Sequence, residues 1–199
     1  ARNQDATARK KAPNAVGSGL FMESIVQNPV YYAMAFEMPM HRDTIRPSEW
    51  LDAYTVRAYG AESDAAQQAW AILLKGPYGP GTNGVESSSI IAARPAIDVK
   101  KSGPNAGFNI PYDPKSLYEA ERLLLQDAEK LETSEIYRFD VVDVQRQIMS
   151  NLGQEIHKAA AAAYKAGDMA GFKKHSGRFL ELLLDVDALL ATRTGGNFD

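Results

Sequence analysis

A carboxylate at the end of a glycine-rich segment is the clearest candidate for chemistry in this chain. Glu23 closes the stretch 17–23, which is rich in glycine and then apolar, as expected for a strand end or a strand-to-helix loop. Barrel enzymes place catalytic groups at the ends of strands. Position alone is a weak signal, because a glutamate before a helix also complements the helix dipole at the surface. Glu23 is therefore a candidate catalytic residue that needs a second argument.

Other acidic and aromatic residues have more common structural interpretations. Asp140 and Asp143 lie in an apolar helical segment, with Arg138 and Arg146 beside them. Such a pair could act in acid–base chemistry or bind a metal, but we interpret it as a structural salt-bridge network between helices. Several aromatic residues could stack on a sugar, although core packing is the more common role for each: Tyr31, Tyr32, Trp50, Trp70 and Tyr118.

The usual cofactor and metal motifs are missing. His41, His157 and His175 are far apart and make no HExxH pattern, so no metal site is predicted. The glycine-rich loop 76–84 has no Lys-Ser or Lys-Thr for binding phosphate, and there is no G-x-S-x-G elbow. The chain contains no cysteine, which excludes disulfides, thiolate zinc sites and a cysteine nucleophile. The sequence therefore predicts no cofactor and no metal.

Composition indicates an ordinary globular chain. Of its 199 residues, 45% are hydrophobic and 24% are charged. The net charge of −3 gives little support to nucleic-acid binding, even though the segment from Arg2 to Lys11 is basic. No apolar run approaches the length of a membrane span. The polar segment 1–14 is no signal peptide, so we expect either a cytoplasmic chain or one whose true N-terminus lies elsewhere.

Helix signals dominate from residue 28 onward. Three shorter helices are predicted, from Asn28-Pro29 to Pro39, from about Ser48 to Gly60, and from Ser63 to a left-handed cap at Gly76. Three longer amphipathic helices follow, starting at Asp113-Pro114 and running to about Leu131, at Ser134, and at Asp168. Residues 76–84 are expected to form an irregular loop, and 90–99 a short extended segment broken by Pro95. Long helices with short turns predict a bundle or helical array.

The stretch 17–37, GSGLFMESIVQNPVYYAMAFE, resembles the alpha-N-acetylglucosaminidases of glycoside hydrolase family 89. Their pattern is close to G-x-G-x-x-x-E-G-I-x-Q-N-x-V-x-Y, and the residues here that fall on it or just beyond it are Gly17, Gly19, Glu23, Ile25, Gln27, Asn28, Val30, Tyr32 and Glu37. The likeness continues through Trp50, the segments 57–60 and 73–74, Trp70 and Arg94-Pro95, and recurs in 137–147, YRFDVVDVQRQ. It thus covers nearly the whole chain from about residue 17.

The resemblance implies a fold and a site. The catalytic nucleophile of the family maps onto Glu23, although Ser24 stands where the family usually has glycine. The implied fold is a (β/α)8 barrel followed by a helical domain. Residues 1–45 would be the last part of the barrel, and 46–199 a helical C-terminal domain that is incomplete at its C-terminus. This chain would then be all-α, a helical bundle or array preceded by a short strand-loop-helix remnant. The general acid of the family, another glutamate, has no counterpart here and is expected outside the chain.

The implied function is retaining exo-hydrolysis of terminal alpha-linked N-acetylglucosamine. Expected partners are a glycan with that terminal sugar and the remainder of the barrel. The residues that bind the substrate remain unassigned. Family members are lysosomal in animals and exported in bacteria, which gives the expected localisation, and the lack of cysteine favours a bacterial source. The alternative is a non-catalytic helical interaction module derived from the same family, in which Glu23 would matter only for stability.

Overall fold

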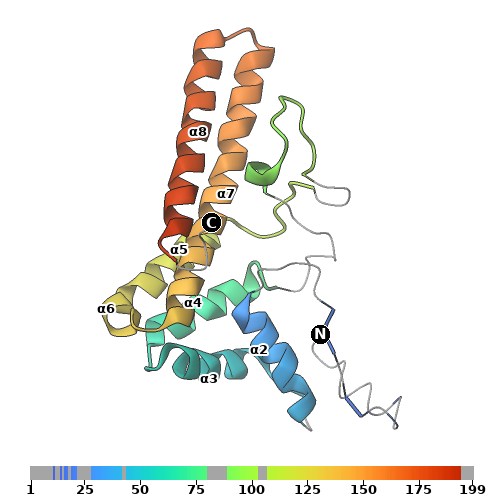
Figure 1. Cartoon of the computed structure of the whole chain (residues 1–199), viewed down its shortest axis with the longest axis vertical. Coiled ribbons are helices and arrows are strands. Elements are labelled where there is room, and N and C mark those ends of the chain that lie inside the picture. The colour runs from blue at the N-terminus through green and yellow to red at the C-terminus, as the bar shows by residue number, and fades with distance from the viewer. Residues whose placement is uncertain are drawn as a thin grey trace.

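Helices make up most of the part of the protein that a computed structural model describes. The described residues are 11, 14, 16–17, 19–21, 28–41, 44–79, 89–102 and 107–193. Two long helices, α7 (Glu135–Lys165) and α8 (Met169–Ala191), form an antiparallel hairpin that extends from a group of shorter helices (Figure 1). That group contains α2 (Pro29–Glu37), α3 (Pro47–Tyr59), α4 (Asp64–Lys75), α5 (Lys115–Leu124) and α6 (Ala128–Leu131). The predicted all-α class is confirmed.

Short 3-10 turns join these helices. They are η1 (Met38–Met40), η2 (Ile90–Ala92) and η3 (Leu125–Asp127). The last one lies between α5 and α6, so the helix predicted from Asp113 to about Leu131 is present but tightens in its middle. Segment 90–99 contains η2 and irregular chain rather than the predicted extended structure. The reason is local: the Ser89 hydroxyl accepts the amide of Ile91 at 3.1 Å and turns the chain.

Side-chain caps account for four of the predicted helix starts. Asn28, Ser63, Ser134 and Asp168 each accept backbone amides from the first turn of the helix that follows. Gly60 ends α3 with φ of 77°, in the left-handed conformation that glycine tolerates. The left-handed cap predicted at Gly76 is wrong, since its φ is −87° and its ψ −111°.

Short helices and the first part of α7 enclose the core. Its most deeply buried large side chains lie on α4, α5 and α6: Leu73, Leu117, Leu124 and Leu131. Trp50 and Trp70 belong to the same cluster, and the ring of Tyr54 stacks on Trp50 with centroids 5.0 Å apart. Because each of these helices has one apolar face, burial against its neighbours is the main source of stability.

Part of the sequence prediction falls outside the described residues. Glu23 lies in the segment 22–27, which the structure does not describe. Among the described residues before it, 16–17 and 19–21 are irregular. The barrel remnant at 1–45 and the boundary with 46–199 therefore stay predictions.

Gly153 lies at a close contact of α7 with η2 and α8. A Cβ atom at this position would lie 3.2 Å from Leu182 Cδ2, 3.3 Å from Ile91 Cγ1 and 3.5 Å from Ile90 Cγ2. A single methyl group requires only a small shift of those flexible side chains, and alanine also favours the helix over glycine. A larger side chain has no such space.

We expect Gly153→Leu to lower the free energy of unfolding by about 3 kcal/mol, because overpacking forces α7 away from η2 and α8. Gly153→Ala should change it by less than about 1 kcal/mol. The matched control is Gly177→Leu on α8, where a Cβ would meet nothing within 4 Å. Urea unfolding followed by circular dichroism measures all three variants. Equal destabilisation by both leucine substitutions would contradict the packing argument.

Candidate functional site

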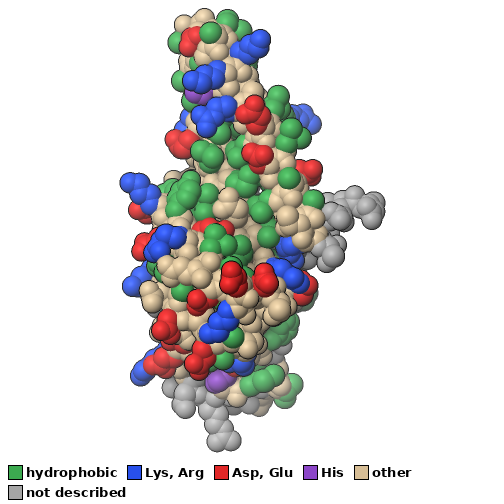
Figure 2. Space-filling model, turned by 90° about the vertical axis from the view of Figure 1, so that its left-hand side faces the viewer, with side chains coloured by type: hydrophobic (Ala, Val, Ile, Leu, Met, Phe, Trp, Pro, Cys, Tyr) green, Lys and Arg blue, Asp and Glu red, His purple; other side chains and the backbone are tan. Residues whose placement is uncertain are grey.

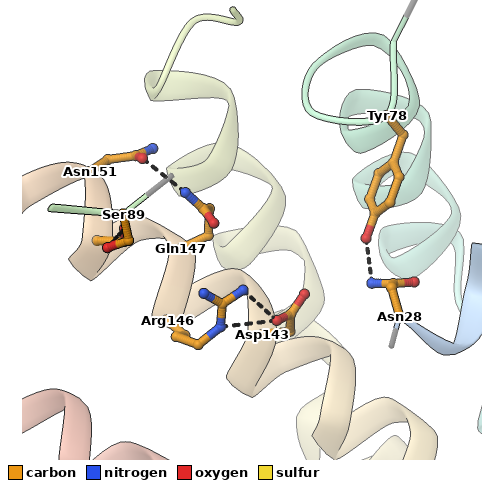
Figure 3. Close-up of polar contacts among 8 residues, drawn as sticks. Asn28, Tyr78, Ser89, Asp143, Arg146, Gln147 and Asn151 are labelled. Atoms are coloured by element: carbon orange, nitrogen blue, oxygen red, sulfur yellow. Dashed lines mark hydrogen bonds and ion pairs between the residues drawn. The ribbon is translucent and has the colours of Figure 1, made fainter. Parts of the chain in front are cut away.

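Asn28 is the first described residue after the segment that contains Glu23. Its Oδ1 atom accepts the backbone amides of Val30 at 3.1 Å and Tyr31 at 3.5 Å, which caps α2. Its Nδ2 atom donates to the Tyr78 hydroxyl at 2.5 Å (Figure 3). Both ends of one amide are thus in use, and the start of α2 is joined to the turn after α4.

Tyr78 lies in that turn with its position fixed from two sides. Its backbone amide donates to the carbonyl of Leu73 at 3.1 Å, and its ring centroid lies 5.8 Å from that of Trp70. Desolvation, and then the nearby Asp143 carboxylate, raise the pKa of Tyr78, so the phenol stays protonated at neutral pH. Since the cap occupies Asn28 Oδ1, the hydroxyl accepts from Asn28 and keeps its own proton available for another acceptor.

Polar side chains on α7 make contacts of their own (Figure 3), and Asp143 and Arg146 are close enough to Tyr78 to affect its pKa. Arg146 donates through Nε and Nη2 to Asp143 Oδ1, at 3.1 and 2.8 Å. Further along the helix, Gln147 donates to Asn151 at 3.0 Å, and Ser150 donates to Ser89 at 2.6 Å. The prediction that these residues form salt bridges between helices is wrong. Asp143 pairs with Arg146 and Arg138 pairs with Glu135, and both pairs lie within α7.

Asp140 has a different role from the one predicted. It is 2% exposed and accepts a hydrogen bond from the Tyr59 hydroxyl at 2.9 Å, and that hydroxyl accepts from Trp70 Nε1 at 2.8 Å. Burial, opposed by the Tyr59 hydrogen bond, raises the pKa of Asp140 to about 8. Asp140 is therefore a neutral buried acid at pH 7 rather than a member of a salt bridge.

The other end of α2 is held by Glu37. Its Oε2 atom accepts from Trp50 Nε1 at 2.7 Å and from Arg57 Nη2 at 3.1 Å, both on α3. His41 Nε2 lies 3.6 Å from Oε1. Helix α2 is thus fixed at its start to Tyr78 and at its end to α3. This arrangement fixes both ends of α2.

Of the five aromatic residues named from the sequence, Tyr32 is half-buried and the other four separate into two groups. Trp50 and Trp70 are buried in the core, as the structural interpretation predicted. Tyr31 and Tyr118 are about half exposed, 51% and 52%, so core packing is wrong for these two. Tyr118 lies on the outer face of the amphipathic helix α5, where its hydroxyl can stay in water. The ring of Tyr31 packs edge-on against that of Tyr32, with centroids 5.4 Å apart.

The histidines named from the sequence can be compared with the described residues. The Nε2 atom of His157 lies 2.9 Å from the carbonyl oxygen of Ala96. Among the residues that the structure describes, no group of three histidine, cysteine or acidic side chains could hold a metal ion. No helix in that part of the chain is long and apolar enough to cross a membrane. Acidic and basic side chains are interspersed on the face shown in Figure 2.

A separate apolar cleft of about 400 Å³ lies between the chain at 93–99 and the α7–α8 hairpin. Ile97, Phe179 and Leu180 are among its walls, together with Arg94 and His157. No carboxylate lines it, so it lacks the acids that glycoside hydrolysis requires. The polar contacts around Asn28 are therefore the better candidate site.

Comparison with known proteins gives one family. The model of the alpha-N-acetylglucosaminidase (NAGLU) C-terminal domain matches residues 50–198. The alpha-N-acetylglucosaminidase of Homo sapiens is 31% identical over 192 residues, which is 93% of this chain and 25% of that protein. The chain thus spans about a quarter of the length of this curated relative.

Solved structures agree with this match. CpGH89 from Clostridium perfringens, with two glutamates replaced by glutamine and in complex with its substrate GlcNAc-alpha-1,4-galactose, superimposes with a TM-score of 0.89 at 29% identity. The match covers 97% of this chain and 22% of that one. A family 89 glycoside hydrolase from the same organism in complex with PUGNAc gives 0.88 at 30% identity, over 97% of this chain and 23% of that chain.

Proposed function

This chain belongs to the alpha-N-acetylglucosaminidase (NAGLU) C-terminal domain family, and from that membership we propose that it is part of a retaining exo-glycosidase. The intact protein hydrolyses terminal alpha-linked N-acetylglucosamine, with Glu23 as the nucleophile and the general acid outside this chain. The resemblance inferred from the sequence is confirmed at the level of the family. The observation that supports the proposal most strongly is the match over 97% of the chain to an enzyme whose substrate carries this sugar linkage.

The stereochemistry of the substrate explains why a protein carboxylate is needed. In an alpha-linked N-acetylglucosamine, the leaving group and the 2-acetamido group lie on the same side of the ring. The acetamido oxygen therefore cannot attack C1 from the opposite side, and the enzyme must supply the nucleophile. Retaining enzymes place their two carboxyl groups about 5–5.5 Å apart and form a glycosyl-enzyme intermediate. In the substrate complex of CpGH89, two glutamates are replaced by glutamine, which is consistent with a two-acid mechanism.

The two acids require different environments. Glu23 must be ionised to attack C1, while the general acid must keep its proton near neutral pH through a raised pKa. The described residues around Asn28 supply part of the support, because they hold α2, which starts immediately after the Glu23 segment. The contribution of this chain is then one catalytic group and the helices that position it.

The test is hydrolysis of an aryl alpha-N-acetylglucosaminide by the intact protein, with the corresponding beta-glycoside as the control. We expect turnover of the alpha-glycoside only, with the alpha anomer of N-acetylglucosamine as the first product by NMR. The 199-residue chain alone should be inactive because the acid is absent from it. Turnover of the beta-glycoside, or first release of the beta anomer, would contradict the proposal.

A further inference from the structure

We propose that the apolar cleft beside the α7–α8 hairpin binds a free medium-chain fatty acid as its carboxylate. Arg94 holds the carboxylate, and the acyl chain lies along α8. The volume of the cleft, about 400 Å³, falls within the range of sites for small ligands. All the residues that line it belong to the described part of the chain, and the inference does not depend on the proposed role of Glu23.

The walls of the cleft leave apolar surface open to water. Ile97, Phe179 and Leu183 line it but are only half-buried. Leu180, which also lines it, is 62% exposed. Removing such surface from water is the main driving force for binding an apolar group. The walls therefore favour a ligand with an apolar body.

Arg94 is the charged side chain of the lining, and its charge has no partner there. It is exposed and forms no ion pair with any acidic side chain in the described part of the chain. The other polar side chains of the lining make contacts within the walls. The Nε2 atom of His157 lies 2.9 Å from the carbonyl oxygen of Ala96, and the Ser176 hydroxyl donates to the carbonyl of Phe172 at 2.7 Å. Because a guanidinium group can donate two parallel hydrogen bonds to a carboxylate, the open polar contact fits one carboxylate.

Contacts along the hairpin place Arg94 toward one end of the cleft. Ile91, three residues before it, lies against Gly153 in the middle of α7. Asp98, four residues after it, pairs with Lys165 at the end of α7. The segment between these contacts therefore runs alongside α7 in the same direction. An acyl chain that starts at Arg94 then extends toward the end of α7.

The dimensions of the cleft favour a single chain of methylenes. Its lining on α8 runs from Phe172 to Leu183, which is about 16 Å along the helix axis. An α-helix of that length occupies roughly 1,300 Å³, several times the volume of the cleft. An extended peptide would bring a row of amide groups against walls whose side chains offer one open polar contact. An acyl chain brings no polar group besides its carboxylate.

The proposal is tested by isothermal titration calorimetry of the intact protein with decanoate below its micelle concentration. We expect one saturable site per protein. The affinity should rise about two- to fourfold for each methylene added between hexanoate and decanoate, because each one covers more of the apolar wall. Absence of binding, or a response that never saturates, would overturn the proposal.

Arg94→Gln tests the contact with the carboxylate through a pair of ligands. It should weaken the binding of decanoate about fivefold and leave the binding of 1-decanol unchanged, since the alcohol has the same chain without the charge. The control is Arg178→Gln, an exposed arginine on α8 outside the lining, which should change neither affinity. Equal weakening of both ligands by Arg94→Gln, or of decanoate by both variants, would contradict the assigned contact.

Ala161→Trp tests the direction of the acyl chain. Ala161 lines the cleft on α7, between His157 and the end of the helix. The indole should weaken decanoate about tenfold or more and hexanoate less than twofold, because only the longer chain reaches that end. Ala162→Trp is the control, at an exposed position outside the lining. Equal loss of both acids in Ala161→Trp, or an equal loss of decanoate in both variants, is the contrary result.

A crystal structure of the unaltered protein with decanoate locates the ligand without any substitution, so the proposal stays testable if a variant does not fold. We expect electron density for the acyl chain in the cleft, with the carboxylate at Arg94. Density for decanoate at another place, and none in the cleft, would overturn the proposal.

Other occupants of the cleft give different results. If the remainder of the intact protein covers it, the 199-residue chain binds decanoate and the intact protein does not. If a second copy covers it, sedimentation shows a dimer that decanoate dissociates. Either result overturns the proposal. Hydrolysis of the alpha-glycoside is measured separately, so failure of this site and failure of the proposed function are distinguishable.

Discussion

In the intact protein, Glu23→Ala is expected to lower kcat for an aryl alpha-N-acetylglucosaminide by roughly 10⁴-fold or more. In the proposed mechanism, the substitution removes the carboxylate that attacks C1 from the face opposite the leaving group. Because the proposed role of Glu23 belongs to the chemical step, KM should change far less than kcat. Steady-state kinetics with the purified variant measures both constants.

Azide should partly restore turnover of Glu23→Ala, because the small anion can occupy the space of the missing carboxylate. It attacks C1 from the same face as Glu23, so the product is the beta-glycosyl azide, which NMR identifies. The control is Glu49→Ala, since Glu49 is exposed, forms an ion pair with exposed Arg46 at 2.6 Å and should be dispensable. Normal turnover by Glu23→Ala, or formation of an alpha-glycosyl azide, would contradict the assignment.

A large effect on stability, similar to that of Gly153→Leu, is expected at Asp140. Asp140→Ala leaves the Tyr59 hydroxyl without its acceptor inside the core, and we expect the free energy of unfolding to fall by about 3 kcal/mol. Asp140→Asn keeps an acceptor of the same shape for Tyr59 and should be tolerated. Urea unfolding of the 199-residue chain measures both variants. Equal losses in the two variants would show that the hydrogen bond is not the cause.

The dependence of stability on pH follows from the same residue. Burial raises the pKa of Asp140 from 3.8 in the unfolded chain to about 8 in the fold, so the folded state holds a proton that the unfolded state releases between these values. Its contribution to stability is complete below about pH 4 and is lost as the pH rises through about 8. Burial also raises the pKa of Glu121 to about 7. The stability of the fold therefore decreases further, by a smaller amount, as the pH rises through about 7.

Asp140→Asn should therefore flatten the change of melting temperature between pH 5 and pH 9 and be the more stable protein at the alkaline end, because its side chain has no proton to release. Glu121→Gln is the matched control. It should remove only the smaller loss of stability that Glu121 causes as the pH rises to about 7. An Asp140→Asn variant with the original pH dependence would show that another group is responsible.

Local chemistry made most of the fold predictable. Asn28, Ser63, Ser134 and Asp168 each cap a helix by a contact within three residues, and such contacts can be inferred from sequence. The features that were predicted wrongly depend on tertiary contacts or on the exact backbone angles of a turn. Residues 90–92 look extended, but they form a turn packed against Gly153 of α7. Gly76 has the residue type of a left-handed cap, yet the chain turns in another way there.

The candidate site was predictable to a smaller extent. Glu23 could be proposed from its neighbours in the sequence and from the family pattern. The partner of Asn28 could not, because Tyr78 lies in a proline- and glycine-rich turn and nothing in its local sequence points to a residue 50 positions away. Glu37 matches the family pattern, but its contacts with Trp50 and Arg57 depend on how α2 packs against α3. Asp140 looked like an ion-pair residue because sequence does not reveal how deeply a helix face is buried.

The central claim is that Glu23 forms the covalent bond to the sugar. The most direct test is to trap the glycosyl-enzyme of the intact protein with a fluorinated, slowly released N-acetylglucosaminyl donor, and to locate the label by peptide mass spectrometry. We expect one sugar per protein, attached to Glu23, and no labelling in Glu23→Ala. A sugar attached to another residue, in a protein that turns over the alpha-glycoside normally, would contradict the account.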